Sequence, residues 1–567
     1  MKKKWLSRTL AMMMAGAMTV GLMAGCGNEA VNSSEQTVES TASEQESVAT
    51  ETQSTEVEES NEITYPLNSG VLELSIGAYG ATTVADVYVS VDDSPWHTGL
   101  GEKTGIDIEW LLPTAGAEIT TSFNLLLQEE ELPNILAGAS ATMNLAKTVE
   151  LYEDGLIYDL TEYLPKYAPD YWEYINRPEN AVYLPSMMTD DGKMLGIYSF
   201  TESEYNGTYL GPVIRQDWLD ECGLKAPRTL EEWENVLTVF KEKYNATLGF
   251  PMNRYSTSGG ISSGTGAQAA LVPRYYVNKD GKICYGNCGE EWKAMLEVFS
   301  SWVEKGLIDP DYATSDDKTT RAKALNGEIG VSITAMSQMT NWEKDAESQG
   351  TGAKWVGFQF PATEVGAPIT FHNVKTRLQA YVATVTTSST EDELIAALKF
   401  LNYGYTEEGM RYHNFGEEGT HYTLDANNEI VLTDLMTKDE GGLDAAFKKY
   451  TGAHTNLFAT IQMSKLVELK NSKAAADAVS KWVENSEAMD YLLPSLVLTS
   501  EEQTRFNELN TALTSYVYET ALKFAAGKES LDKYEEYEKT IYEMGLQECL
   551  DIYQAAYDRY ISRTISK

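Results

Sequence analysis

Leu72-Glu-Leu-Ser-Ile76, followed by Gly77-Ala-Tyr-Gly80, is the stretch that decides the expected fold. Its apolar residues alternate with polar ones, which predicts a half-buried strand that runs into a glycine-containing loop. Further strands are predicted at 106–110 and 132–138, with a partly helical segment between the first two. Strands that alternate with helices favour an α/β unit with a largely parallel sheet, and ligands of such sheets bind at the carboxyl ends of the strands.

The rest of the chain predicts a second unit and many helices. The 567 residues exceed what one core usually holds, so two or more lobes are expected. Thr229 with Glu232, and Thr390 with Glu393, match the capping box that begins a helix. A third helix is predicted at 290–305, and the pattern from Thr499 to the end is almost wholly helical.

The first 26 residues have the features of a secretory signal peptide. Three lysines and Arg8 precede an apolar run from about 10 to 23, which ends in Met23-Ala-Gly-Cys26. The cysteine resembles that of a bacterial lipobox, although methionine stands where leucine is usual. We therefore expect residues 1–25 to be removed and Cys26 to carry a covalent lipid such as palmitate. The protein is then expected on the extracellular face of a bacterial cell membrane, held by its lipid anchor.

Residues 27–62 contain ten Glu, no Lys or Arg, and hardly any large apolar side chain. Such a segment cannot bury enough surface to offset its ordering entropy, so a disordered tether is expected. The formal net charge of the whole chain is −41. This charge repels nucleic acid and anionic lipid and suits a neutral small ligand.

Five cysteines are present, of which Cys26 is assigned to lipid. Cys284 and Cys288 flank a Gly-Asn turn, and their spacing of four without a histidine partner is poor for zinc. Reduced thiols or one local disulfide are both expected alternatives. No metal spacing is seen among the five histidines either.

Three phrases of the sequence occur in a recognisable order. They begin at Arg215 (Arg-x-Asp-Trp-Leu-Asp-x-Cys-Gly-Leu-x-x-Pro-x-Thr), at Glu304 (Glu-Lys-Gly-Leu-Ile-Asp-Pro-Asp-Tyr-Ala-Thr) and at Asn414 (Asn-Phe-Gly-Glu-Glu-Gly-Thr-His-Tyr). Together they resemble the lipoprotein members of extracellular solute-binding protein family 1, the oligosaccharide type that serves ABC importers.

The resemblance implies a two-lobed, periplasmic-binding-protein-like type II fold with a long helical C-terminal extension. By analogy, residues 63–203 and 374–430 form lobe 1, and residues 204–373 and 431–567 form lobe 2. The resemblance also implies a carbohydrate ligand, closure of the lobes around it, and ABC permease subunits as membrane partners. A monomer that binds no nucleic acid is expected.

A calcium ion is not expected, and no other cofactor is. Some relatives carry a calcium loop after the helix that follows the Trp-Leu-Asp phrase. Here that place reads Lys241-Glu-Lys-Tyr-Asn-Ala-Thr-Leu-Gly-Phe250, which lacks clustered oxygen ligands.

A sugar presents an apolar face and a rim of hydroxyls, so its site needs an aromatic platform beside fixed polar groups. Aromatic residues in predicted loops, and polar residues beside the predicted return between lobes, are therefore the candidates, with packing or hinge roles as alternatives. The candidates are Tyr79, Trp96, Tyr198, Trp342, His372 and Arg377.

Other classes of function stay open at this point. A peptide-binding importer component or a surface adhesin without a transport role is the first alternative. A glycan-cleaving enzyme is the second, because 85 acidic residues make paired carboxylates easy to propose. The motifs of serine hydrolases, zinc proteases and P-loop enzymes are absent from the sequence. No catalytic residues are therefore assigned.

Overall fold

The computed structural model describes residues 62–79, 87–88, 91–113, 118–139, 141–202, 207–452 and 459–563. The predicted signal peptide, the predicted lipidation site Cys26 and residues 27–61 of the predicted tether lie outside the described residues. Within the described part, no helix is both long enough and apolar enough to cross a membrane.

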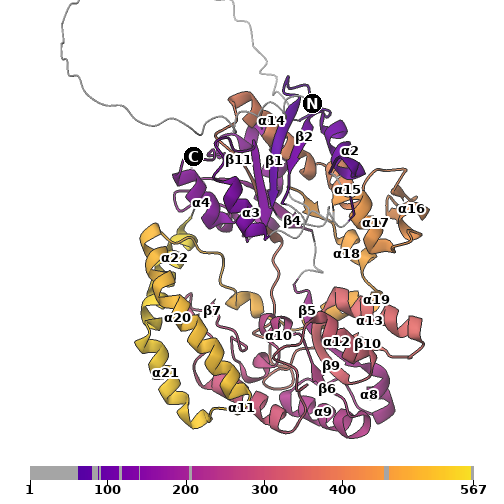
Figure 1. The fold of residues 1–567 in the computed structure, drawn as a ribbon, viewed down its shortest axis with the longest axis vertical. Helices are drawn as coiled ribbons and strands as arrows, with labels where there is room; N and C mark the ends of the chain where they lie inside the picture. Colours follow the sequence, from indigo (N-terminus) through magenta and orange to yellow (C-terminus); the bar gives the residue numbers. More distant parts are fainter. Residues whose placement is uncertain are drawn as a thin grey trace, which may run out of the picture. The chain divides into compact units, whose positions relative to one another are not determined.

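A six-stranded sheet forms the centre of what we call the first lobe (Figure 1). β1 (Glu73–Tyr79) runs parallel to β2 (Asp107–Leu111) and β3 (Ile135–Ala139), which confirms the three strands predicted in this region. β11 (Leu378–Val385) then lies antiparallel between β3 and β4 (Ile197–Thr201), and β14 (Ile461–Gln462) runs parallel to β4. The strand order is therefore β14-β4-β11-β3-β1-β2.

Helices cover this sheet, and all of them except the short helix at 178–181 bury residues in its core. They are α2 (Pro95–Thr104), α3 (Ile119–Leu126), α4 (Leu145–Glu153), α5 (Leu164–Tyr167), α6 (Pro169–Asn176), α7 (Pro178–Ala181), α14 (Glu391–Asn402) and α15 (Glu407–Phe415). The predicted capping box at Thr390 is complete, since Thr390 and Glu393 each accept the other's backbone N–H. α2 ends at Gly105, whose left-handed φ of 76° is open to glycine without strain.

A four-stranded sheet of order β10-β5-β9-β6 forms the centre of the second lobe. β5 (Leu210–Arg215) is antiparallel to β9 (Ile329–Ala335) and to β10 (Trp355–Gly357), while β6 (Thr247–Gly249) runs parallel to β9. The hairpin of β7 (Tyr275–Val277) and β8 (Ile283–Tyr285) stands apart from this sheet. The helices of this lobe are α8 (Gln216–Cys222), α9 (Leu230–Tyr244), α10 (Met252–Ser258), α11 (Glu290–Glu304), α12 (Asp317–Leu325), α13 (Met336–Gln349) and α19 (Lys473–Trp482).

The capping box predicted at Thr229 is only half formed. Thr229 Oγ1 accepts the backbone N–H of Glu232 at 3.3 Å, as expected. The Glu232 carboxylate instead accepts the N–H of Arg228, one residue before the cap, at 2.7 Å. The helix still begins where the sequence predicts.

The long C-terminal helices are confirmed as α20 (Ser500–Ala525), α21 (Tyr534–Glu543) and α22 (Leu546–Ser562), which lie side by side (Figure 1). They pack on the second lobe, because Phe506, Leu513 and Tyr537 are buried in the same core as Trp292 of α11. At its far end, α22 also contacts the first lobe, where Arg559 and Arg563 pair with Asp190 at 2.9 and 2.8 Å.

The segment after residue 430 differs from the expected division of the chain. It was expected in lobe 2, but β14 completes the first sheet. α17 (Leu443–Tyr450) and α18 (Ser464–Lys470) share a small core with Phe415 of α15. β12 (Tyr422–Leu424) precedes this segment and pairs with β13 (Ile430–Leu432), and α16 (Asp434–Thr437) follows β13. Only from α19 onward does the chain return to the second sheet, because α19 packs on β5 and β10.

The chain therefore passes three times between the two sheets, and hydrogen bonds hold the crossing segments. Thr201 N–H donates to Arg377 O at 2.8 Å, and Lys375 N–H donates to Gly207 O at 3.1 Å, so the first two crossings run together. Glu202 N–H donates to Gln462 O at 2.9 Å, which attaches β14 to the end of β4 within the first sheet. The third crossing follows α18, where Ser472 N–H donates to Thr340 Oγ1 at 3.0 Å.

Trp482 fixes α19 to the second sheet. Its indole is fully buried against Gly211, and its Nε1–H donates to Pro212 O at 2.8 Å. We expect Trp482→Ala to lower the free energy of unfolding by about 3–5 kcal/mol, because both the packing and the hydrogen bond are lost. Chemical denaturation followed by circular dichroism measures this change.

Lys481→Ala is the matched control, because the neighbouring Lys481 side chain is 58% exposed. We expect it to change the free energy of unfolding by less than about 0.5 kcal/mol. Equal losses in the two variants would contradict the assignment of Trp482 as the anchor of α19.

Candidate functional site

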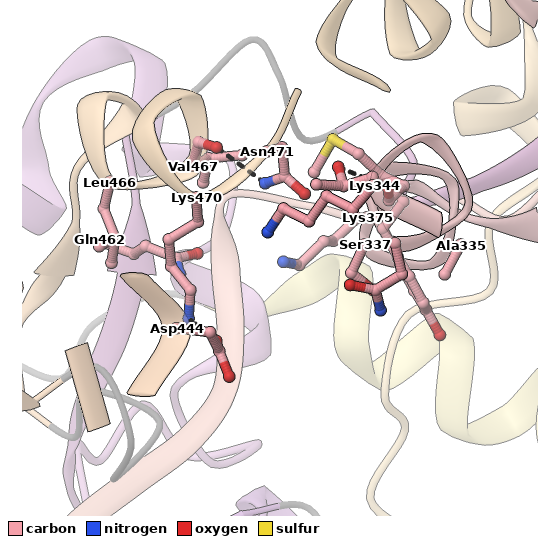
Figure 2. A pocket seen from close by; sticks show the side chains of 14 residues that line it. Ala335, Ser337, Lys344, Lys375, Asp444, Gln462, Leu466, Val467, Lys470 and Asn471 are labelled. Atoms are coloured by element: carbon pink, nitrogen blue, oxygen red, sulfur yellow. Dashed lines mark hydrogen bonds and ion pairs between the residues drawn. The ribbon is translucent and has the colours of Figure 1, made fainter. Parts of the chain in front are cut away.

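A cavity of about 370 Å³ lies where the three crossing segments meet (Figure 2). One side of its wall comes from the second lobe and the first two crossings. The other side comes from α17, β14, α18 and the third crossing. The lining residues are Tyr209, Ala335, Met336, Ser337, Thr340, Asn341, Lys344, Lys375, Asp444, Gln462, Leu466, Val467, Lys470 and Asn471. Most of these side chains carry a hydrogen-bonding group, so the cavity suits a polar ligand.

One face of α13 forms the second-lobe wall of the cavity. α13 begins directly after β9 at the carboxyl end of that strand, where α/β proteins usually bind ligands. Ser337, Asn341 and Lys344 follow one another at helical spacing and face the cavity. The opposite face carries Met339 and Trp342, which are buried.

The sequence predicted that Trp342 contacts a ligand, but its side chain does not line this cavity. The structure packs it in the second lobe's core, with its ring centroid 4.9 Å from that of Trp355 and only 3% of its surface exposed. The region predicted to hold a ligand residue does line the cavity, but it does so through polar neighbours of the tryptophan.

The opposite wall is built by α17, β14 and α18. Lys470 lies 3.3 Å from a carboxylate oxygen of Asp444, and Lys448 pairs with the same carboxylate at 3.1 Å. Burial opposes ionisation of Asp444, but these two lysines hold its pKa below the ordinary value. Asn471 donates its side-chain N–H to Val467 O at 2.7 Å, which orients the amide at the cavity edge.

Lys375 enters the cavity from the second crossing. Burial lowers the pKa of its ammonium group, because the charged form loses hydration. Figure 2 shows the ammonium groups of Lys375 and Lys344 pointing toward the middle of the cavity. Among the described residues, neither group has a hydrogen-bond or ion-pair partner.

A second cavity of about 670 Å³ adjoins the first. The two share Thr340, Lys344, Asp444, Lys470 and Asn471, so they form one continuous groove. The second cavity adds two acidic residues of α13, Glu343 and Glu347, and the loop residues Gly442 and Ser472. Ser472 N–H donates to Thr340 Oγ1 at 3.0 Å and so ties the third crossing to α13.

Trp96 and Tyr198, expected near a ligand, instead belong to the first lobe's core. Trp96 is fully buried, and its ring lies 5.3 Å from that of His413. Tyr198 is 5% exposed and packs in the same core from β4. Tyr79 ends β1, but its side chain lies outside the described part of the structure. The two buried rings present no surface to a ligand.

His372 and Arg377, the other two expected residues, make contacts within the protein. The ring nitrogens of His372 lie 2.7 Å from Asn373 O and 2.6 Å from Ser486 Oγ, and burial lowers its pKa. Arg377 donates to Glu202 O at 2.7 Å and to Asn180 Oδ1 at 3.3 Å. Neither lines the described groove, although Arg377 lies only two residues from Lys375.

The sequence held a signal for some of the groove residues. Ser337, Asn341 and Lys344 are polar at helical spacing beside an apolar stripe, which predicts an open helix face. Lys470 gave no such signal, because its segment was assigned to the other lobe. The four described cysteines outside the predicted lipid site are free thiols, so of the two alternatives for Cys284 and Cys288 the structure has the reduced one.

Comparison with known proteins places this chain among binding proteins. Residues 94–411 match the family model described as bacterial extracellular solute-binding protein. Lipoprotein LipO of Bacillus subtilis is 24% identical over 360 residues, which cover 60% of this chain and 68% of that protein. The fructooligosaccharide ABC transporter substrate-binding protein FusA of Streptococcus pneumoniae is 22% identical over 500 residues, covering 81% and 86%.

The fold agrees with that of solved binding proteins. A solute-binding protein of Bifidobacterium longum infantis, described as an HMO-binding protein associated with an ABC transporter, superposes with a TM-score of 0.67 at 17% identity. The match covers 87% of this chain and all of that one. This chain thus has the two-lobed fold of solute-binding proteins. Since the matched model also spans more than half of the sequence, this chain belongs to the bacterial extracellular solute-binding protein family.

Proposed function

We propose that this protein is the extracellular substrate-binding lipoprotein of an ABC importer and that its ligand is an oligosaccharide. The names of its relatives support this, since FusA is a fructooligosaccharide-binding importer component and the Bifidobacterium protein is an HMO-binding one. In this proposal the two lobes close on the ligand, and the closed form delivers it to the permease subunits.

The observation that carries the proposal is the polar groove at the three crossings. Its walls come from both lobes, so a ligand held there contacts residues that a hinge motion moves relative to one another. The first cavity alone, at about 370 Å³, is within the usual range of small-molecule sites. Asn341, Asn471 and Gln462 supply amides that both donate to and accept from hydroxyl groups.

We also propose that the protein binds its ligand without cleaving it. Its relatives are binding proteins rather than enzymes, and the groove chemistry described above suits recognition. We propose a monomer as well. We also propose that the protein does not bind nucleic acid, because the charge of −41 repels polyanions.

No calcium requirement is proposed. α9 is followed by a left-handed residue, Asn245, and β6 begins two residues later at Thr247, and this short connection supports the proposal. Among the residues that the structure describes, no three acidic, histidine or cysteine side chains are grouped to hold a metal.

The first of three predictions from this proposal concerns ligand binding by the full chain purified in mild detergent. We expect one oligosaccharide per protein by calorimetry, the same affinity with and without a calcium chelator, and unaltered sugar by chromatography afterwards. Shortened glycans would establish an enzyme, and heat released only with peptides would establish a peptide-binding protein.

The second prediction separates the groove from the core. Asn341→Ala should weaken oligosaccharide binding by about 1–2 kcal/mol, since it removes hydrogen bonds to the ligand. Trp96→Phe is the matched comparison, and it should leave the affinity unchanged while lowering the free energy of unfolding by about 1–3 kcal/mol. The reverse pattern, with affinity lost only in Trp96→Phe, would refute this location of the site.

The third prediction concerns the membrane anchor. In a bacterial host, Cys26→Ala should abolish incorporation of labelled palmitate and prevent anchoring by covalent lipid, because the thiol is the proposed acceptor. Cys222→Ala is the control, since Cys222 is a free thiol in the folded part of the chain. Undiminished labelling of Cys26→Ala would exclude this lipidation site.

A further inference from the structure

The first cavity has the opposite charge to the protein as a whole. Lys344, Lys375 and Lys470 line it, and Asp444 is the only acidic residue among its described lining residues. The chain carries a formal charge of −41, so a local excess of positive charge departs from its general field. The neutral ligand that the overall charge suggested does not explain three lysines in one polar cavity.

Lys375 is the informative member of this set. It is half-buried, which is enough for desolvation to lower its pKa, and no described carboxylate pairs with it. A buried charge without a partner costs folding free energy, and so does a buried polar group that lacks hydrogen bonds. A ligand that brings a negative charge next to Lys375 recovers part of this cost on binding.

The two other lysines are placed to share the same anion. Lys344 projects from α13 toward the same space as Lys375, and Lys470 stands on the opposite wall, where Asp444 already holds it (Figure 2). Ammonium groups are compact charges with freely rotating hydrogen-bond donors, so they bind carboxylate, sulfate and phosphate groups alike. The amide of Asn471 adds a further donor at the edge.

The charge changes along the groove. The second cavity contains Glu343 and Glu347 in addition to the shared residues, so its far end is acidic. An anionic group is therefore favoured only at the lysine end, and the acidic end suits hydroxyl groups that donate hydrogen bonds. This difference gives a bound chain a direction.

We propose that the Lys344, Lys375 and Lys470 end of the groove binds an oxyanion carried by an acidic carbohydrate, with the neutral remainder of the chain extending toward Glu343 and Glu347. This inference rests on the proposed function and narrows its ligand from oligosaccharides in general to those with a carboxylate, sulfate or phosphate group. The groove then selects by charge as well as by shape.

The test begins with a glycan array of matched pairs. Each acidic oligosaccharide, with separate sets for uronate, sulfate and phosphate ester, is paired with its neutral counterpart of the same length and linkage. We expect the full chain to bind members of an acidic set. Their neutral counterparts should bind about ten- to a hundredfold more weakly, because hydrogen bonds to a charged group contribute about this factor to the affinity. Raising the NaCl concentration should weaken the acidic interaction more than the neutral one.

Variants then locate the effect. For the tightest acidic ligand, Lys375→Gln and Lys344→Gln should each weaken binding by about tenfold, while the affinity for the neutral counterpart changes by less than about threefold. Lys354→Gln is the matched control, since Lys354 is exposed on the same lobe and lines neither cavity. Circular dichroism confirms that each variant is folded.

The outcomes distinguish the two proposals. Binding of neutral oligosaccharides only, or equal loss for acidic and neutral partners in Lys375→Gln, would overturn the anion site and leave the carbohydrate receptor intact. An array without any bound glycan would overturn the receptor proposal together with the anion site.

Discussion

The hydrogen bonds that hold the three crossing segments are the constraint on which the rest of this structure depends. Each lobe has its own sheet and its own buried core, and the crossings between them are held by pairs such as Lys375 N–H with Gly207 O and Ser472 N–H with Thr340 Oγ1. Main-chain groups supply most of the atoms in these links, so the connection places few demands on side chains. It leaves the side chains beside the crossings available for a ligand, and the groove is lined by such residues.

The side chains that line the groove come from elements in different parts of the chain. α13 contributes one polar face because its other face is committed to the core around Trp342 and Trp355. Lys375 lies in the groove because its backbone is held to Gly207, and Lys470 because α18 packs on the small core around Phe415. The three lysines come from segments that lie up to 126 residues apart in the sequence, and none of these segments is basic by itself. In a strongly acidic protein such convergence favours an anionic partner at this end.

The site was only partly predictable, for a physical reason. Large aromatic residues suit both a sugar and a protein core, and in Trp96, Tyr198 and Trp342 the gain from burying the ring decided for the core. For Trp342 the helical spacing with Met339 already indicated a buried stripe. His372 was expected to be available to a ligand, but Asn373 and Ser486 occupy its ring nitrogens. No local pattern reveals such long-range partners.

The sequence by itself determined the strands around Leu74, the helix that begins at Thr390, the helical C-terminus and the likeness to solute-binding proteins. These depend on alternation, spacing and capping, which act between neighbours in the chain. Only the tertiary structure decided that β14 and residues near 431–470 complete the first lobe, and that three distant lysines share one cavity. Ile461 pairs with Phe200, more than 200 residues away in the sequence. This pairing is stabilised by hydrogen bonds to the open edge of β4, and the local sequence around Ile461 does not encode where that edge lies.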